Sequence, residues 1–358
     1  MSHVLVIGAG LSGCTAAKYL ADQNIKVSLI EKSDRIGGKV RSYGCKAVDK
    51  CQNCGVCLSG SLWDKVLSHP GINILFGSKL ENISGKSGNF TVTLRNINIT
   101  KDEVFNNITA VLICTGFESK SNRLSSHLQI EDTTGILTGT QLEELMFYRS
   151  KTGLFNTDID YIPCNMPGNI QGCISDNVPS GIAFIQCTGS RDVNEGGLYC
   201  SRVCCSYSTR SAKVFRSYYP ECKIVFFYME MQNVEFGNYF TGLQELDMEF
   251  INCRPLRIKG GTPVTVEYDA PSEGIKSRTF DLVVLSDGIH ACSDNDHIAE
   301  ICNIGQDRDG FLQETGSTSG IFVSGCAKAP MKIDEAYADS IAAAGRVLNM
   351  IQSNREKM

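Results

Sequence analysis

Cysteine is the residue type whose number and spacing most clearly indicate chemistry in this sequence. The chain has 17 cysteines in 358 residues, and several of them lie two, three or no residues apart. A chain of this length can bury a core without disulfide support. The clustering therefore indicates metal binding or redox chemistry rather than a disulfide-stapled scaffold.

One cysteine group lies in the middle of the chain. A helix predicted over about 200–218 places Cys200 and Cys204 one turn apart on one face, with Cys205 adjacent. Cys187 ends a predicted strand and can reach the same point. Four thiolates near a helix N-terminus suit an iron–sulfur cluster, because the helix dipole favours its negative charge. Zinc accepts the same ligands, and a buried structural role is the third interpretation.

A second cysteine group lies near the N-terminus. Cys51, Cys54 and Cys57 repeat the first three positions of a bacterial ferredoxin run, and Cys45 is the nearest candidate for a fourth ligand. The competing interpretation is a redox-active dithiol formed by Cys51 and Cys54 beside a flavin. The sequence thus predicts one iron–sulfur cluster in the middle group and allows a second one here.

A glycine motif precedes both cysteine groups. Gly8, Gly10 and Gly13 follow a predicted strand and open a predicted helix, in the pattern Gly-x-Gly-x-x-Gly. Such glycines let backbone N–H groups approach a pyrophosphate at the helix N-terminus. Glu31 ends the next predicted strand, 18 residues beyond Gly13, where a carboxylate accepts a ribose hydroxyl. The motif predicts a dinucleotide site.

Further residues favour FAD over NAD as that dinucleotide. Glu31 is followed by Lys32 and then by a second glycine pair, Gly37 and Gly38, which is characteristic of two-dinucleotide-binding flavoproteins. Thr115 and Gly116 end a buried strand and look like the second FAD contact of those proteins.

The C-terminal part adds a third predicted flavin contact. Gly325 and Cys326 follow a predicted strand and precede an alanine-rich helix. Disulfide reductase relatives carry an Asp that holds the ribitol where Cys326 stands. The helix that follows can present backbone N–H groups to the flavin pyrimidine.

Strands and helices alternate on both sides of these motifs. The predicted fold is α/β, with two Rossmann-like doubly wound halves of the thioredoxin-reductase type and a small antiparallel element. Residues 1–119 and 310–358 form the expected FAD domain, 120–180 a connecting segment and 181–309 a second Rossmann-like domain that carries the cluster. The strand that ends at Cys187 is not followed by Gly-x-Gly-x-x-Gly, which argues against a nicotinamide site there.

Composition excludes several classes of function. Hydrophobic residues make up 42% and charged residues 20% of the chain, and the net charge is −5. That charge gives no reason to expect nucleic acid or an anionic membrane as a partner. The longest apolar runs are strand-sized, and no signal peptide is recognisable, so a cytoplasmic protein is expected.

With these motifs in view, the chain resembles the A subunit of heterodisulfide reductase over nearly its whole length. The resemblance rests on the FAD motif and on three further stretches of sequence: Ile185-Gln186-Cys187-x-Gly189-Ser190-Arg191-Asp192, Tyr199-Cys200-Ser201-Arg202-Val203-Cys204-Cys205 and Gly325-Cys326-Ala327-Lys328. It implies that the cysteines of the middle group bind a [4Fe–4S] cluster close to FAD. It also implies iron–sulfur partners resembling the B and C subunits of heterodisulfide reductase, and a ferredoxin-like electron carrier.

Two departures from that family matter. The archaeal protein is larger and carries an inserted ferredoxin domain, so this chain resembles the short, bacterial-type relatives. Arg210 stands where the family commonly has a lysine close to flavin N5, and it is the candidate catalytic residue. Arginine is always charged and reaches differently from lysine.

The expected function is that of an FAD and iron–sulfur electron-transfer subunit in a heterodisulfide-reductase-like complex, and a homodimer is possible. The rival is a self-contained, thioredoxin-reductase-like enzyme with a Cys51–Cys54 dithiol. A third hypothesis is a non-enzymatic scaffold that binds FAD for structure alone. Iron content separates the first two, and reduction of the flavin by dithionite separates both from the third.

Overall fold

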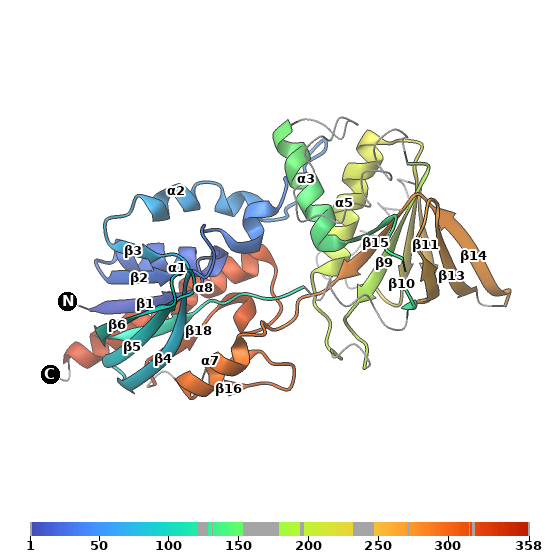
Figure 1. The fold of residues 1–358 in the computed structure, drawn as a ribbon. Coiled ribbons are helices and arrows are strands. Elements are labelled where there is room, and N and C mark those ends of the chain that lie inside the picture. The colour runs from blue at the N-terminus through green and yellow to red at the C-terminus, as the bar shows by residue number, and fades with distance from the viewer. Residues whose placement is uncertain are drawn as a thin grey trace. The chain divides into compact units, whose positions relative to one another are not determined.

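The chain folds into two compact units (Figure 1). Our computed structural model describes residues 2–119, 128–130, 132–152, 179–193, 197–231, 247–270, 272–314, 316 and 319–356, with the backbone alone at 148–152. Unit 1 comprises Met1–Ser42, Gly55–Glu118 and Ile289–Met358, and unit 2 comprises Tyr43–Cys54 and Ser119–Gly288.

Unit 1 is built on a five-stranded parallel sheet in the order β18-β7-β1-β2-β3. Its strands are β1 (His3–Ile7), β2 (Lys26–Ile30), β3 (Ile72–Leu75), β7 (Ala110–Ile113) and β18 (Ile321–Val323). The helices of this unit are α1 (Leu11–Asp22), α2 (Leu62–Leu67), α7 (Asn295–Cys302) and α8 (Ile333–Glu356), with short 3-10 helices η1 (Gly38–Ser42), η2 (Val56–Ser59) and η5 (Gly325–Ala327).

Two antiparallel elements complete unit 1. A three-stranded sheet consists of β4 (Ser78–Lys86), β5 (Asn89–Asn96) and β6 (Lys101–Ile108), and a two-stranded one of β16 (Gly305–Gln306) and β17 (Leu312–Gln313). The predicted small antiparallel element is therefore present in this half of the molecule.

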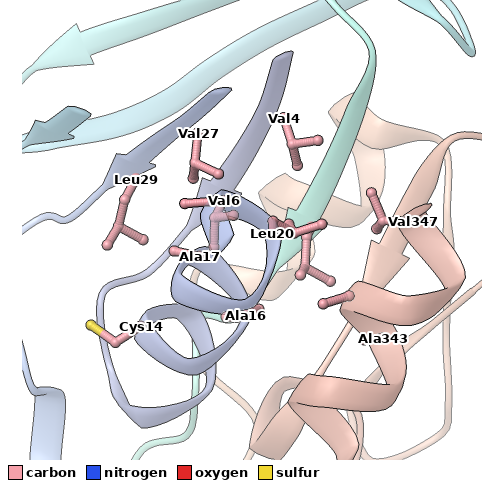
Figure 2. Packing of buried hydrophobic residues seen from close by; sticks show 14 of the residues in the cluster. Val4, Val6, Cys14, Ala16, Ala17, Leu20, Val27, Leu29, Ala343 and Val347 are labelled. Atoms are coloured by element: carbon pink, nitrogen blue, oxygen red, sulfur yellow. The ribbon is translucent and has the colours of Figure 1, made fainter. Parts of the chain in front are cut away.

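Small apolar residues let α1 and α8 pack closely against the parallel sheet. Figure 2 shows Val4 and Val6 of β1 and Val27 of β2 facing α1, while Ala343 and Val347 of α8 approach the same helix. Val4, Val6 and Val27 are fully buried, and so is Leu20 of α1. A Leu20→Ala change would cost about 2–5 kcal/mol of stability. This packing holds the N-terminus of α1 at the carboxyl edge of the sheet.

Unit 2 repeats this architecture with different strands. Its parallel sheet has the order β11-β10-β9-β15-β8. The strands are β8 (Ile136–Thr138), β9 (Gly181–Thr188), β10 (Lys223–Tyr228), β11 (Met248–Asn252) and β15 (Leu282–Asp287). Side chains of α3 (Gly139–Thr152) and α5 (Cys204–Tyr218) share one apolar cluster with this sheet. A second cluster joins the sheet to the antiparallel strands β12 (Pro255–Lys259), β13 (Val264–Ala270) and β14 (Gly274–Phe280).

The boundaries of the units differ from the predicted domains in three places. Tyr43–Cys54 groups with unit 2, although the chain on both sides of it belongs to unit 1. Residues 289–309, expected in the second domain, group with unit 1. The predicted connecting segment contributes β8 to the sheet of unit 2 and continues into α3.

The helix predicted over about 200–218 begins four residues later than expected, so this prediction was wrong at its N-terminal end. Helix α5 starts at Cys204, and Cys200 lies outside it. The reason is the backbone of Arg202, whose φ of 63° is incompatible with a right-handed helix. Cys200 and Cys204 therefore do not share a helical face. Among the helices that the structure describes, none is long and apolar enough to cross a membrane.

Candidate cofactor sites

The glycine turn of unit 1 leaves open backbone at the N-terminus of α1. An added Cβ at Gly13 would lie 1.8 Å from the Gly8 carbonyl oxygen, so the turn and the helix can touch only through glycine. At Gly10 the nearest atom to an added Cβ is the Gly38 Cα at 4.0 Å. No side chain of the described residues caps α1, and its first turn has no acidic residue. The space and the free N–H groups suit a pyrophosphate.

The second glycine pair packs against this turn. Gly37 donates its N–H to the Ala9 carbonyl at 2.7 Å, and both Gly37 and Gly38 have positive φ. An added Cβ at Gly38 would lie 3.0 Å from the Gly10 Cα. The two glycine segments, predicted separately, thus pack directly against each other.

Glu31 is held beside the glycine turn at the end of β2. One carboxylate oxygen accepts the Ala9 N–H at 2.8 Å, and the other accepts the N–H and the hydroxyl of Ser33, each at 2.9 Å. Three of roughly four lone-pair positions are used, which leaves room for one ribose hydroxyl. The Lys32 ammonium forms an ion pair with Asp294 at 3.0 Å, and hydrogen bonding to this carboxylate raises the pKa of Lys32 although burial opposes the shift.

Thr115 and Gly116 follow β7, the neighbour of β1 in the sheet. The Thr115 hydroxyl donates to the Asn295 side chain at 3.1 Å, and Asn295 is fully buried. Gly116 has φ 79°, and no atom of the described residues lies within 4 Å of the place where its Cβ would be. The open backbone at Gly116 suits a ligand at the same edge of the sheet. Sequence reasoning did not identify Asn295, which comes from a distant part of the chain.

Gly325 brings the C-terminal part of the chain onto the N-terminus of α1. An added Cβ there would lie 2.1 Å from the Ser12 hydroxyl oxygen. The Gly325 N–H and the Ser324 hydroxyl both donate to Asp339 of α8, each at 2.9 Å. Asp339 is thus the residue that fixes this turn, and no motif in the sequence signalled it.

Cys326 places a neutral side chain directly after Gly325. Its side chain is buried and donates to the Met331 carbonyl at 3.6 Å. Burial raises the pKa of the Cys326 thiol to about 12, so it stays protonated at neutral pH. A thiol held this way is a poor partner for a ribitol hydroxyl.

In unit 2 the chain after β9 is folded back on the segment that carries Cys200. Arg191 donates its N–H to the Tyr199 carbonyl at 3.1 Å, and the hydroxyls of Ser190 and Ser201 lie 2.6 Å apart. Both serines are buried. These contacts bring Cys187, at the end of β9, and Cys200 into one loop cluster.

Burial raises the pKa of two cysteines of the middle group. Burial raises the pKa of Cys204 well above its ordinary value, and charge on neighbouring groups raises it further. These neighbours include the other three cysteines of the group: Cys205, Cys187 and Cys200. Burial also raises the pKa of Cys187, although the positive charge of Arg191 partly offsets it. Metal binding at these thiols must therefore displace protons.

The residue types of the middle group are those that bind an iron–sulfur cluster, but their arrangement is not that of a formed cluster site. Cys204 and Cys205 open α5, whose first turn has no acidic residue and no side-chain cap from the described part of the chain. That environment favours a negatively charged cluster. Within the described ranges, no three Cys, His, Asp or Glu side chains are arranged as a formed metal site. The four thiols would therefore have to move closer together to bind one cluster.

The N-terminal cysteines lie on a segment that docks on unit 2. Cys45 and Cys51 are exposed and Cys54 is half-buried, all within Tyr43–Cys54. Cys57 is exposed in η2 of unit 1, three residues beyond Cys54. None of the cysteines that the structure describes forms a disulfide.

A buried ion pair anchors this segment to α3. The Lys46 ammonium lies 2.5 Å from the Glu143 carboxylate, and the two side chains are 3% and 8% exposed. Burial raises the pKa of Glu143, and the charge of Lys46 opposes that shift. An added Cβ at Gly44 would lie 2.5 Å from the Met146 backbone, so the segment touches α3 directly. Sequence reasoning identified neither contact.

Arg210 lies on α5 and binds the same segment. Its guanidinium donates to the backbone carbonyls of Gln52 at 2.9 Å and Asn53 at 3.1 Å. These carbonyls lie between Cys51 and Cys54. Arg210, the predicted catalytic residue, thus contacts the turn between Cys51 and Cys54 within its own unit.

Comparison with solved structures identifies the fold as that of thioredoxin reductase. The thioredoxin reductase of T. acidophilum matches with a TM-score of 0.62 and 15% identity, over 98% of this chain and 99% of that one. The Lactococcus lactis enzyme matches with a TM-score of 0.60 and 15% identity, over 99% and 100% of the two chains. Residues 6–63, which contain the glycine motif and Glu31, match the family described as NAD(P)-binding Rossmann-like domain.

Curated relatives confirm the resemblance that the motifs predicted. The chain is 25% identical over 448 residues to the A subunit of the ferredoxin:CoB-CoM heterodisulfide reductase of Methanosarcina acetivorans, covering 96% of this chain and 56% of that protein. It is 25% identical to the iron-sulfur A subunit of the CoB–CoM heterodisulfide reductase of Methanocaldococcus jannaschii, covering 96% and 63%. The chain thus spans little more than half the length of the curated relatives it matches.

Proposed function

We propose that this protein is an oxidoreductase that binds FAD in unit 1 and a [4Fe–4S] cluster in unit 2, and that it transfers electrons between them and partner proteins. The observation that carries the proposal is the loop after β9: hydrogen bonds fold the segment of Cys187 against that of Cys200, and this loop leads into the first turn of α5, which holds Cys204 and Cys205. The open glycine turn at α1 supports the FAD half.

The residues of unit 1 would bind and orient the dinucleotide. The first-turn N–H groups of α1 would bind the pyrophosphate, and Glu31 would accept a ribose hydroxyl. Gly116 and Gly325 would let the backbone approach the ligand. Bound FAD supplies the exchange between two-electron and one-electron steps, and the protein tunes and positions it.

The residues of unit 2 would hold the cluster. Cys187, Cys200, Cys204 and Cys205 are the proposed ligands, and the dipole of α5 stabilises the negative charge that they bring. A second cluster at Cys51, Cys54 and Cys57, with Cys45 as the nearest further thiol, is the proposed role of the N-terminal group.

Partner proteins follow from the kind of relative that the chain resembles. The relatives are named as subunits of heterodisulfide reductases, and several of the names include ferredoxin. We propose iron–sulfur partners resembling the B and C subunits of such complexes, a ferredoxin-like carrier and a homodimer. We further propose a cytoplasmic location, because clustered reduced thiols belong to reducing compartments.

The test is the cofactor content of anaerobically purified protein. Flavin absorption with a broad cluster shoulder, and about four iron atoms per cluster, is the expected result. Iron and acid-labile sulfide assays that find neither element would refute the cluster. Dithionite titration then tests the scaffold hypothesis, which predicts that the bound flavin is not redox-active.

The fold and the position of Cys51 and Cys54 favour a second candidate function, a self-contained disulfide oxidoreductase. The Cys51 thiol is exposed and the Cys54 thiol is half-buried, and both lie in the segment that groups with unit 2. This alternative predicts rapid stoichiometric bleaching of the flavin by NADPH alone. Our proposal predicts slow reduction, because cysteines and their supporting loops occupy the turn after β9.

A further inference from the structure

A single side chain of α5 clamps the turn between Cys51 and Cys54. Arg210 Nε donates to the Gln52 carbonyl at 2.9 Å, and Nη2 donates to the Asn53 carbonyl at 3.1 Å. In return the Gln52 side-chain amide donates to the Arg210 carbonyl at 3.4 Å. The clamp therefore joins the two segments in both directions.

The clamped turn has a conformation that a free chain rarely adopts. Asn53 has φ 50°, in the left-handed region. In this conformation its N–H donates to Cys51 Sγ at 3.4 Å. The peptide groups that Arg210 binds are thus the ones that orient the N–H toward the sulfur. Hydrogen bonds of this kind to a ligating sulfur tune the potential of an iron–sulfur cluster.

The geometry points to Arg210 as a positioning residue for the Cys51 and Cys54 thiols. Helix α5 carries Cys204 and Cys205 in its first turn and Arg210 about one and a half turns further on. One helix thus carries two cysteines of the middle group and also holds the turn between Cys51 and Cys54. The redox meaning of this clamp rests on the proposed function of the N-terminal cysteines, but the clamp itself does not.

The planar shape of the guanidinium and its several donors explain why an arginine suits this position. A guanidinium offers several N–H donors in a planar fork and can bind two neighbouring carbonyls at once. A lysine ammonium is a compact point charge on a flexible stem, which holds the two carbonyls less rigidly. Arg210→Lys should therefore rescue only part of the effect of Arg210→Gln.

The first experiment is hydrogen–deuterium exchange of the segment 43–54 in the anaerobically purified protein. Loss of two charge-assisted hydrogen bonds in Arg210→Gln should speed exchange in this segment by about tenfold. Arg216→Gln is the matched control, because Arg216 lies on the same helix and donates to the carbonyls of Pro220 and Asp247 instead. It should leave the exchange of 43–54 unchanged.

The second experiment uses the low-temperature paramagnetic signal of the reduced protein. Cys51→Ser identifies the signal of the N-terminal group, and Arg210→Gln should alter that same signal. If Cys51→Ser changes neither iron content nor signal, the proposed cluster at this group is wrong, while faster exchange in Arg210→Gln still supports the clamp.

Two outcomes would overturn the inference. Exchange of 43–54 that is the same in Arg210→Gln and the parent protein would mean that Arg210 does not hold the turn. A shifted flavin potential with unchanged exchange would instead assign Arg210 to the flavin, as the family resemblance implies.

Discussion

The turn after β1 in unit 1 and the turn after β9 in unit 2 follow equivalent strands, yet they are built in opposite ways. The first is three residues of mostly bare backbone between Ile7 and Leu11. The second spans 15 residues between Thr188 and Cys204, and side chains hold it together. The first turn leaves open space at Gly10, and the second carries cysteine side chains.

The backbone conformations of the two turns show the same contrast. In the turn after β1, positive φ occurs at Gly8, with φ 95°. Around the turn after β9 it occurs at Gly189, with φ 75°, and also at residues with side chains: Cys187 at 59°, Arg191 at 57° and Arg202 at 63°. Non-glycine residues in this region cost energy and persist where the surroundings impose them, often at functional sites. The strain supports a functional role for the loops around Cys187 and Cys200.

The largest expected effect comes from removing a ligand in the side-chain-built turn. Cys204→Ser should lose one cluster, about four iron atoms, and retain FAD, because the proposed FAD site belongs to unit 1. Serine oxygen is a harder and poorer iron ligand than a thiolate. Iron per flavin is the measurement, and Cys222→Ser, at a buried core cysteine of the same unit, is the control.

An unchanged iron-to-flavin ratio in Cys204→Ser would show that these cysteines are not the ligands. Loss of FAD together with iron would show that the two turns depend on each other, contrary to their separate construction.

A smaller effect is expected from adding one carbon to the backbone-built turn. In Gly10→Ala the new methyl meets no described atom closer than 4.0 Å, so the fold should tolerate it. The methyl would occupy the space through which the pyrophosphate approaches, and FAD affinity should fall by about tenfold or more. Flavin retention on dilution measures this. Gly345→Ala, with open space around it in α8, should bind FAD normally.

The positions of strand, turn and helix were easier to predict from sequence in unit 1 than in unit 2, for a physical reason. A glycine motif fixes its own geometry, since the contacts at Gly8 and Gly13 exclude any side chain. The strand, turn, helix and acidic residue therefore came out where the motif placed them. The sequence predicted a helix at the middle cysteine group but the wrong start of α5, because nothing local marks the positive φ of Arg202.

Long-range polar contacts were the part that sequence could not supply. Asp339 fixes the turn at Gly325, and Glu143 pairs with Lys46 from 97 positions away. Arg210 was identified as important, but its partners depend on a segment that leaves unit 1 and docks on unit 2. Such pairs have no characteristic spacing and appear only when the tertiary structure brings them together.

The anchor of that segment gives the third prediction. Lys46→Met leaves the Glu143 carboxylate buried without its partner, which should destabilise unit 2 by about 3–5 kcal/mol. Lys18→Met, which breaks an exposed pair with Asp22, should cost under about 1 kcal/mol. Chemical denaturation followed by a probe in each unit measures both. A double variant, Lys46→Met with Glu143→Leu, should recover much of the loss, and failure to do so would mean that the pair supplies more than charge compensation.

The smallest expected effect concerns Gln186, which immediately precedes Cys187. Its side chain is 2% exposed, and neither its amide nitrogen nor its amide oxygen has a hydrogen-bond partner among the described residues. Burial of such orphan groups costs free energy, so Gln186→Leu should stabilise the iron-free protein by about 1–2 kcal/mol. Unit 1 offers the opposite case in Glu31, whose carboxylate oxygens both accept hydrogen bonds. Urea unfolding of the two iron-free proteins makes the comparison, and destabilisation by Gln186→Leu would show that the amide is satisfied in solution and that the turn after β9 is as fully bonded as the turn after β1.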